Sequence, residues 1–286
     1  MNPDSVAPRD GSTTYYSLLY CDAESRVRAM HTLRLIQTIS TTLFDVTEPQ
    51  VAEQKIHWWH EEIARMAKHS AGHPVCKATQ DFLCNKPELN ACLSLLSTTA
   101  SERFAPLATK SALDEHITSD YSARLTLLGT ALNQIAPPTA QTESADNAIA
   151  LALGQCHRLN TLGLRLRSGY SVFSDEHYSQ FETTPEYLSG EASDTAEQNS
   201  ALLNSAIANA SANMNHTMSG KGDVSHSRFA QCLPLAINCS LRQAQMNMWS
   251  KRSPDLVNGT LTLTPLKKFF VAYRCRRRFE KRNPLR

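Results

Sequence analysis

Apolar residues recur at intervals of three and four along most of this 286-residue chain, and this periodicity limits the possible folds more than any other feature. In QKIHWWHEEIARM, residues 54–66, Ile56, Trp59, Ile63 and Met66 fall on one face of a helix, so Trp59 is expected to anchor the core. Alternating apolar and polar runs with hairpin signals are scarce. The sequence therefore predicts a nearly all-helical protein.

The predicted helices are separated by polar or proline-rich breaks. Their ranges are 15–42 (as one or two helices), 48–69, 75–84, 87–98, 107–135, 145–167, 185–190, 196–218, 226–250 and 264–282. The breaks are short and no repeat of fixed period is visible, so one domain suffices. We expect a disordered segment at 1–14, a helical domain at 15–266, and a basic helix and tail at 267–286.

The composition indicates a cytoplasmic protein. No apolar run approaches the ~18 residues that a membrane-spanning helix needs. The N-terminal sequence MNPDSVAPRDGSTT lacks the apolar core of a signal peptide. The eight cysteines include no CxxC pair, so they are expected to be reduced, buried thiols.

Two patterns that suggest metal sites are set aside. Three cysteines recur at eight-residue intervals within 76–92, but Pro87 interrupts any continuous helix there. The stretch 57–61 reads HxxHE, which is neither the HExxH nor the HxxEH arrangement of zinc proteases. No metal site is therefore predicted from these residues.

Four regions carry motifs in a fixed order. Residues 54–66 are similar to a K-L-x-W-W-R-x-E-I signature, and YYSLLYCDAESRVRAMHTLRLIQTI (15–39) is similar to a set of opening helices. ALALGQCHRLNTLGLRLRSGYSVFSDEHY (150–178) is similar to A-x-x-L-G-x-A-x-Q-L-T-N-I-L-R followed by G-R-x-Y-L-P, and residues 233–269 to a closing L-P…K-K element. Together they resemble the squalene and phytoene synthase family. The resemblance implies an all-α isoprenoid-synthase-like bundle around a central cavity.

The resemblance also implies a reaction, the head-to-head joining of two prenyl diphosphates. In that reaction Mg²⁺, held by two DxxxD motifs, neutralises the leaving diphosphate. Here Thr38, Ile39 and Thr42 stand at the first motif, and Gly163 and Leu164 stand at the arginine and first aspartate of the second. This chain therefore resembles the non-catalytic members of the family, the best known of which is an assembly factor of respiratory complex I.

A single pair of acids in the chain has i, i+4 spacing. This pair is Glu182 and Glu186, and Pro185 stands between them. Because proline marks a helix start here, Glu182 is expected to lie outside the helix, so the two carboxylates would not share a face.

Three arginines offer a different chemistry near the expected motif positions. Arg165 and Arg167 follow the second position, and Arg34 lies within the helix of the first. Arginine can bind an anion directly by bidentate hydrogen bonds without a metal. The alternative is that all three are solvated or lie at helix edges.

The C-terminal residues 267–286 carry nine Lys or Arg residues and one acid, which leaves the rest of the chain net acidic. The expected membrane or anionic-surface contacts are Lys267, Lys268, Phe269, Phe270, Arg274, Arg276, Arg277 and Arg278. The alternative is that the aromatic residues pack as the last core helix and the arginines keep a tail solvated. Nucleic-acid binding is disfavoured because no recognition motif accompanies the arginines.

The sequence thus favours a non-catalytic protein without a cofactor that binds a lipid or isoprenoid, an anionic ligand or a protein partner, in the cytoplasm and peripheral to the membrane. The alternative is an active prenyltransferase that uses Mg²⁺. Its metal ligands would then be acids outside the aligned motifs, such as Asp22, Glu24, Asp45 or Glu62.

Overall fold

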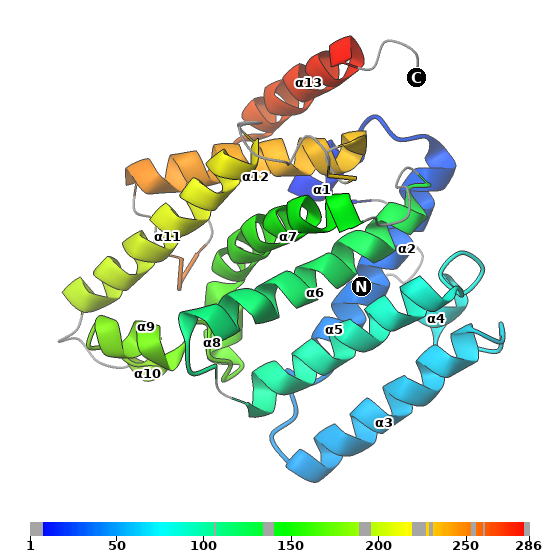
Figure 1. Ribbon diagram of the computed structural model, residues 1–286, viewed down its shortest axis with the longest axis horizontal. Helices are drawn as coiled ribbons and strands as arrows, with labels where there is room; N and C mark the ends of the chain where they lie inside the picture. Colours follow the sequence, from blue (N-terminus) through cyan, green and yellow to red (C-terminus); the bar gives the residue numbers. More distant parts are fainter. Residues whose placement is uncertain are drawn as a thin grey trace. The chain divides into compact units, whose positions relative to one another are not determined.

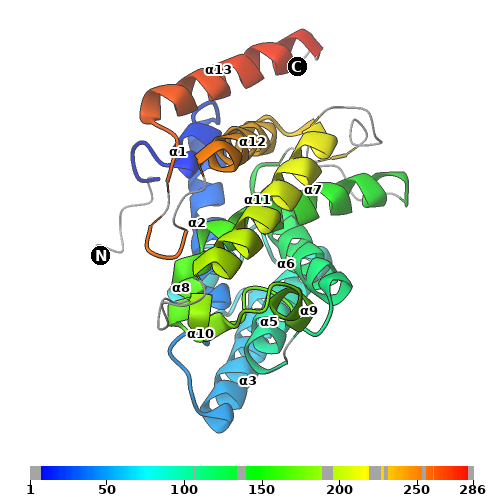
Figure 2. The ribbon, with the colours of Figure 1, turned by 90° about the vertical axis from the view of Figure 1, so that its left-hand side faces the viewer.

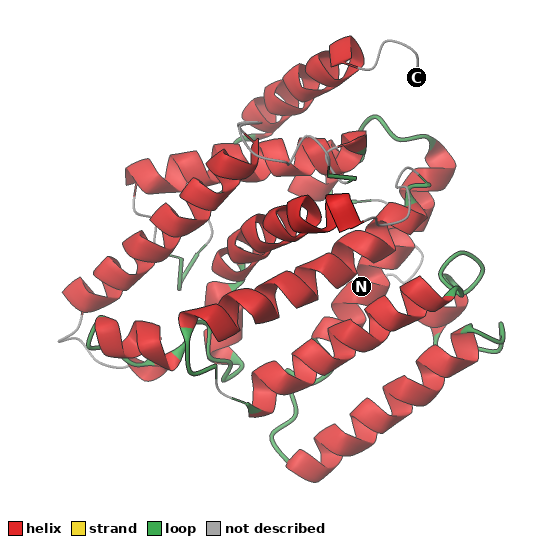
Figure 3. Cartoon of the chain, viewed as in Figure 1, coloured by secondary structure: helices red, strands yellow, loops and turns green. Residues whose placement is uncertain are grey.

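The computed structural model describes residues 8–105, 107–133, 140–188, 196–218, 227–228, 231–252, 256–259 and 261–282. Over these ranges the chain forms helices α1–α13 and no strand (Figure 1, Figure 3). The predicted all-α fold class is confirmed. The chain divides into two compact units.

The first unit comprises Met1–Pro8, Cys21–Ala105 and Ser119–Ala136. Its helices are α2 (Ala23–Ser40), α3 (Pro49–Met66), α4 (Pro74–Lys77), α5 (Lys86–Phe104) and the C-terminal part of α6 (Lys110–Ala131). Trp59, Ile63 and Met66 of α3 are buried in a core shared with α2, α5 and α6. The predicted core face of α3 is thereby confirmed, while Trp58 stays 40% exposed.

The second unit comprises Arg9–Tyr20, Pro106–Thr118 and Pro137–Arg286. Besides the first part of α6, its helices are α1 (Thr13–Ser17), α7 (Ala140–Asn160), α8 (Leu162–Arg167), α9 (Asp175–Gln180), α10 (Pro185–Leu188), α11 (Ala196–Met218), α12 (Leu233–Arg252) and α13 (Pro265–Arg282). α12 is central to this unit, because it packs against α1, α7, α11 and α13 (Figure 2).

Local sequence explains where several helices begin. Asp22 caps α2, because its Oδ1 accepts a hydrogen bond from the backbone N–H of Ser25 at 2.7 Å. Pro49 is the first residue of α3, where its missing N–H costs nothing. Ser174 caps α9 in the same way as Asp22 caps α2. The sequence prediction missed α9, a helix of six residues that is too short to show apolar periodicity.

The helix predicted at 145–167 is broken into α7 and α8. Asn160 Nδ2 donates to the carbonyl of Cys156, and Thr161 Oγ1 donates to the carbonyl of His157. The break lies at Thr161, which leaves the helical conformation with φ −106° and ψ 8° although its backbone N–H still donates to the carbonyl of His157. The helix predicted at 75–84 is likewise shortened to α4.

The first fourteen residues were predicted to be disordered. Residues 1–7 lie outside the described residues, whereas Ser12 caps α1, which begins at Thr13. Residues 283–286 of the predicted tail also lie outside the described residues. The boundaries predicted at 14 and 266 stay predictions.

Six of the eight cysteines are buried, as expected, and Cys84 and Cys275 are half-buried. Burial raises the pKa of Cys156 and of Cys239 to about 12. At neutral pH these thiols are protonated and chemically inert.

Candidate functional site

The residues aligned with the first DxxxD motif, which are Thr38, Ile39 and Thr42, lie at the end of α2 and just after it, in the first unit. Thr38 Oγ1 donates to the carbonyl of Arg34 at 2.8 Å, and Ile39 is fully buried in the core. Thr42 Oγ1 accepts a hydrogen bond from Nε1 of Trp59 at 2.8 Å. Both hydroxyl groups are thus used inside the unit, and this position carries no carboxylate.

Glu62 of the WWxxE stretch has a scaffold role. Its side chain is fully buried. Oε1 accepts the backbone N–H of His73 at 2.5 Å, and Oε2 accepts from Nη1 of Arg65 at 3.2 Å. Glu62 therefore ties the loop before α4 to α3.

Arg124 holds α6 to the end of α2 within the first unit. Its Nε lies 2.8 Å from Oδ2 of Asp120, and its Nη2 donates to Oγ of Ser40 at 2.8 Å. Sequence reasoning missed this pair, although the i, i+4 spacing of Asp120 and Arg124 is a signal for it. Asp120 is committed to this contact and does not offer a metal ligand.

The position of the second motif lies at the start of α8, in the second unit. A Cβ atom on Gly163 would lie 2.0 Å from the carbonyl oxygen of Val257, and Nη1 of Arg167 donates to the same oxygen at 3.3 Å. The neighbouring Leu164 is 47% exposed. The close approach of this backbone leaves no room at residue 163 for the arginine of the family motif.

The side chains at the two motif positions do not fit a magnesium site. Mg²⁺ needs carboxylate oxygens to balance its charge, and these positions supply hydroxyl groups, hydrocarbon and a glycine. Among the described residues, no group of three or more His, Cys, Asp or Glu side chains could hold a metal ion.

The acids considered as alternative ligands have other contacts or lie apart from the motif positions. Asp22 caps α2, and Glu24 lies 3.7 Å from Arg28. Asp45 is exposed in the turn after α2, and Glu62 is buried in the contacts given above. Glu182 adopts a positive φ of 50° before α10 begins, which confirms that it and Glu186 do not share a helical face.

The three arginines predicted to bind an anion are divided between the units. Arg34 lies on α2 in the first unit. Arg165 lies on α8 in the second, is 7% exposed and donates from Nε to Oγ1 of Thr161 at 3.1 Å. Arg167 is engaged with the carbonyl of Val257. That these arginines bind an anion stays a prediction.

A small pocket of the second unit, about 60 Å³ in volume, has several polar lining residues that are hydrogen-bonded within the protein. Its polar residues are Asp114, Gln155, Arg158, His177 and Asn209. Gln155 Nε2 donates to Asp114 Oδ1 at 3.1 Å, and Arg158 Nε donates to the carbonyl of Val172 at 2.6 Å. The first contact holds α7 against α6, and the second holds the segment after α8 against α7, so both have a structural role.

The environment of His177 predicts that the stability of the second unit depends on pH. Burial, followed by the positive charge of Lys110, lowers the pKa of His177 below its ordinary value of 6.5. The unfolded chain therefore binds more protons than the folded protein as the pH is lowered through about 6.5. The free energy of unfolding consequently decreases as the pH is lowered. We expect His177→Gln to lose less stability between pH 7.5 and pH 5 than the parent protein, as measured by urea unfolding. The exposed His60→Gln is the control, and equal pH dependence in all three proteins would contradict the role of His177.

The last helix, α13, carries apolar side chains on two faces. Val271, Ala272 and Cys275 pack against a cluster that contains Tyr16, Ile237, Leu241 and Leu263. Phe269, Phe270 and Tyr273 lie outside this cluster and are 41%, 49% and 45% exposed. The alternative in which these aromatic residues form the core contact is therefore wrong, because Val271 and Ala272 occupy that position.

The basic residues of α13 also differ in their environment. Lys268 is 6% exposed and its Nζ donates to the carbonyl of Gly11 at 2.8 Å, so the prediction that it contacts an external surface is wrong. Burial, and then Arg242, lowers the pKa of Lys268. Arg276 forms an ion pair with Glu280 at 2.6 Å. The remaining predicted basic contacts, which are Lys267, Arg274, Arg277 and Arg278, are exposed.

None of the helices in the described part of the chain combines the length and the apolar composition that crossing a bilayer requires.

Comparison with solved structures defines the class of protein, which is the all-α isoprenoid synthase fold. A dehydrosqualene synthase in complex with ligand is 13% identical to this chain, with a TM-score of 0.71, and the match covers 94% of this chain and 92% of that one. Squalene synthase HpnC from Alicyclobacillus acidocaldarius is 14% identical, with a TM-score of 0.56 and coverage of 93% and 88%. A search of curated proteins found no match.

The sequence model of the squalene/phytoene synthase family matches residues 7–265. The chain therefore belongs to the squalene/phytoene synthase family, and the resemblance inferred from its motifs is confirmed.

Proposed function

We propose that this chain is a non-catalytic member of the squalene/phytoene synthase family that binds an anionic membrane surface through the exposed face of α13. The observation that carries the proposal is the exposed aromatic strip of Phe269, Phe270 and Tyr273, which the exposed Leu266 extends, on a helix anchored by its opposite face. A helix held in this way can insert its outer side chains without unfolding.

The chemistry of the two motif positions supports the absence of prenyl transfer. Ionising an allylic diphosphate requires charge neutralisation by metal ions. The hydroxyl groups of Thr38 and Thr42 donate or accept hydrogen bonds within the first unit. The backbone of Val257 fills the space that a side chain at residue 163 would need. We expect the purified protein to form no head-to-head product from farnesyl diphosphate with Mg²⁺ and NADPH, and product above the heat-inactivated control would overturn this part.

Charge supports a membrane as the partner of α13. Lys267, Arg274, Arg277 and Arg278 are exposed alongside the aromatic strip. Each lysine or arginine near an anionic bilayer contributes on the order of 1 kcal/mol, and aromatic side chains favour the headgroup level. An aromatic strip flanked by cations matches a bilayer interface in both respects.

Liposome co-sedimentation tests the membrane contact. We expect Phe269→Ser/Phe270→Ser to weaken binding to phosphatidylserine liposomes at least tenfold, because two partly exposed aromatic side chains lose roughly 1 kcal/mol each of burial. Binding should also decrease in high salt, since the cations are screened.

The matched control is Phe104→Ser, which removes an aromatic residue that is 46% exposed in the first unit. If the control and the double variant bind as tightly as the parent protein, α13 is not the contact surface. Equal binding to neutral liposomes would also refute the anionic preference.

A further inference from the structure

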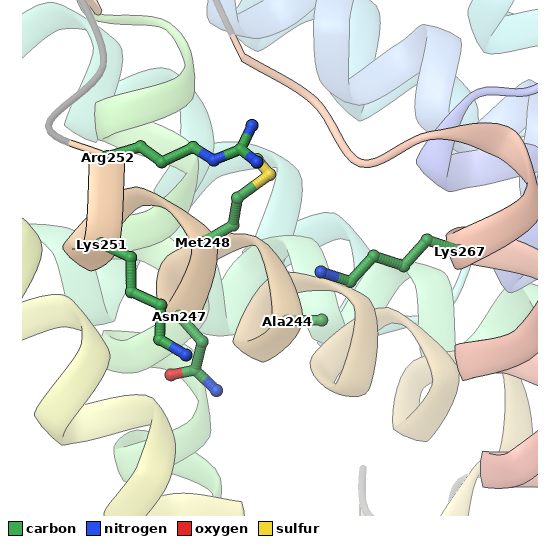
Figure 4. A pocket seen from close by; sticks show the side chains of 6 residues that line it. All are labelled: Ala244, Asn247, Met248, Lys251, Arg252 and Lys267. Atoms are coloured by element: carbon green, nitrogen blue, oxygen red, sulfur yellow. The ribbon is translucent and has the colours of Figure 1, made fainter.

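A second pocket of the second unit lies along the C-terminal half of α12 and has a volume of about 360 Å³. Its lining residues are Ala244, Asn247, Met248, Lys251 and Arg252 of α12, and Lys267 of α13. Arg252 extends over Met248, and Lys267 reaches from α13 toward the same stretch of α12 (Figure 4). The volume falls within the range of small-molecule sites.

The charged part of this lining is entirely cationic. Lys251, Arg252 and Lys267 contribute three positive charges, and no carboxylate belongs to the described lining. Lys251 and Arg252 lie in the last turn of α12, where the helix dipole favours cations. Lys267 lies in the first turn of α13, where the dipole disfavours a cation and no acid is present. An anion bound in the pocket near Lys267 would offset that repulsion.

The rest of the lining is apolar. Ala244 and Met248 are half-buried and pack against the cluster beneath α12 and α13. They place hydrocarbon next to the cationic side chains. The side chain of Met248 can adjust its conformation to a flexible acyl chain, because methionine is unbranched and polarizable. An inorganic anion has no hydrocarbon, so it would make no apolar contact with Ala244 and Met248.

We propose that this pocket binds a phosphomonoester headgroup together with the first part of its acyl chain, as in a phosphatidic-acid-type lipid. Arg252 offers paired N–H donors to phosphate oxygens, and the two lysines add point charges. Met248 and Ala244 contact the hydrocarbon next to the headgroup. The inference rests on the proposed membrane docking for the source of the lipid, and it names the headgroup that the protein would select there.

Isothermal titration calorimetry with dihexanoyl phosphatidic acid, kept below its micelle concentration, tests the pocket apart from the membrane contact. We expect Lys251→Ala/Arg252→Ala/Lys267→Ala to weaken binding at least tenfold, and Phe269→Ser/Phe270→Ser to leave it unchanged. Met248→Gln should weaken binding of the lipid but not of inorganic phosphate. The matched control, Lys68→Ala/Lys77→Ala/Lys86→Ala, removes three exposed cations from the first unit.

Two results would overturn the proposal as a whole: no binding of the short-chain lipid by the parent protein, or equal binding of it by the triple pocket variant. Equally tight binding of inorganic phosphate would also overturn it, because it would show that the acyl chain of the lipid makes no contact with the pocket. The short-chain lipid forms no bilayer, so the two proposals can fail separately. If the parent protein binds the short-chain lipid but not the liposomes, only the proposed docking of α13 is contradicted. If the parent protein binds the liposomes but not the short-chain lipid, only the proposed pocket is contradicted.

Discussion

Replacement of Gly163 by alanine is expected to lower the melting temperature of the protein by about 6 to 12 °C. The added Cβ would lie 2.0 Å from the carbonyl oxygen of Val257 and 3.0 Å from its carbonyl carbon. A backbone carbonyl cannot rotate away as a flexible side chain can. Overpacking of this severity costs about 3 kcal/mol, and each kcal/mol corresponds to roughly 2 to 4 °C in a chain of this size. Differential scanning calorimetry measures the shift.

Gly259→Ala is the matched control, because a Cβ on Gly259 would meet no atom within 4 Å. Its melting temperature should stay close to that of the parent protein. If Gly163→Ala melts together with Gly259→Ala, the segment containing Val257 moves aside at little cost. The close approach would then not limit what residue 163 can be.

The same contact bears on any attempt to rebuild the metal motif. In the alignment suggested by the motifs, the family's arginine falls at Gly163 and its aspartate falls at Leu164. An aspartate at Leu164 meets no such obstacle, since that side chain is 47% exposed, but the arginine collides with the backbone of Val257. Substitution of the motif residues alone is therefore not expected to create a magnesium site in this chain.

Replacement of Glu62 by alanine is expected to reduce the free energy of unfolding of the first unit by about 2 to 3 kcal/mol. The substitution removes the acceptor of the His73 backbone N–H, which lies 2.5 Å from Oε1. It also releases Arg65 and leaves a cavity in a fully buried position. Urea unfolding followed by tryptophan fluorescence measures the loss, because Trp58 and Trp59 lie on the same helix.

Two further variants test whether the loss of stability comes from the buried hydrogen bonds of Glu62 or from removing any acidic residue of α3. Glu62→Gln keeps an oxygen that can accept from His73 and should lose less stability than Glu62→Ala. Glu53→Ala removes an exposed acid from the same helix and should change stability by less than about 0.5 kcal/mol. A loss in Glu53→Ala equal to that in Glu62→Ala would mean that helix propensity or net charge, and not the buried contact, accounts for the effect.

Most helices could be predicted because their apolar positions repeat over three or more turns. The α3 helix shows this, since the spacing of Ile56, Trp59, Ile63 and Met66 predicted both the helix and its buried face. The α9 helix could not be predicted, because six residues capped by Ser174 carry no periodic signal. The lack of carboxylates at the residues aligned with the motifs is a prediction from the sequence, whereas the close approach of Val257 to Gly163 could not be predicted from it.

The amino-acid sequence by itself determined that the chain is helical and that it belongs with the squalene and phytoene synthases. Tertiary structure alone decided that Lys268 turns inward to Gly11 while Phe269, Phe270 and Tyr273 face outward, and that Lys267 lines the same pocket as Lys251 and Arg252 of α12. The reason is physical: helical periodicity states which residues share a face, but which face is covered depends on neighbours that are distant in sequence.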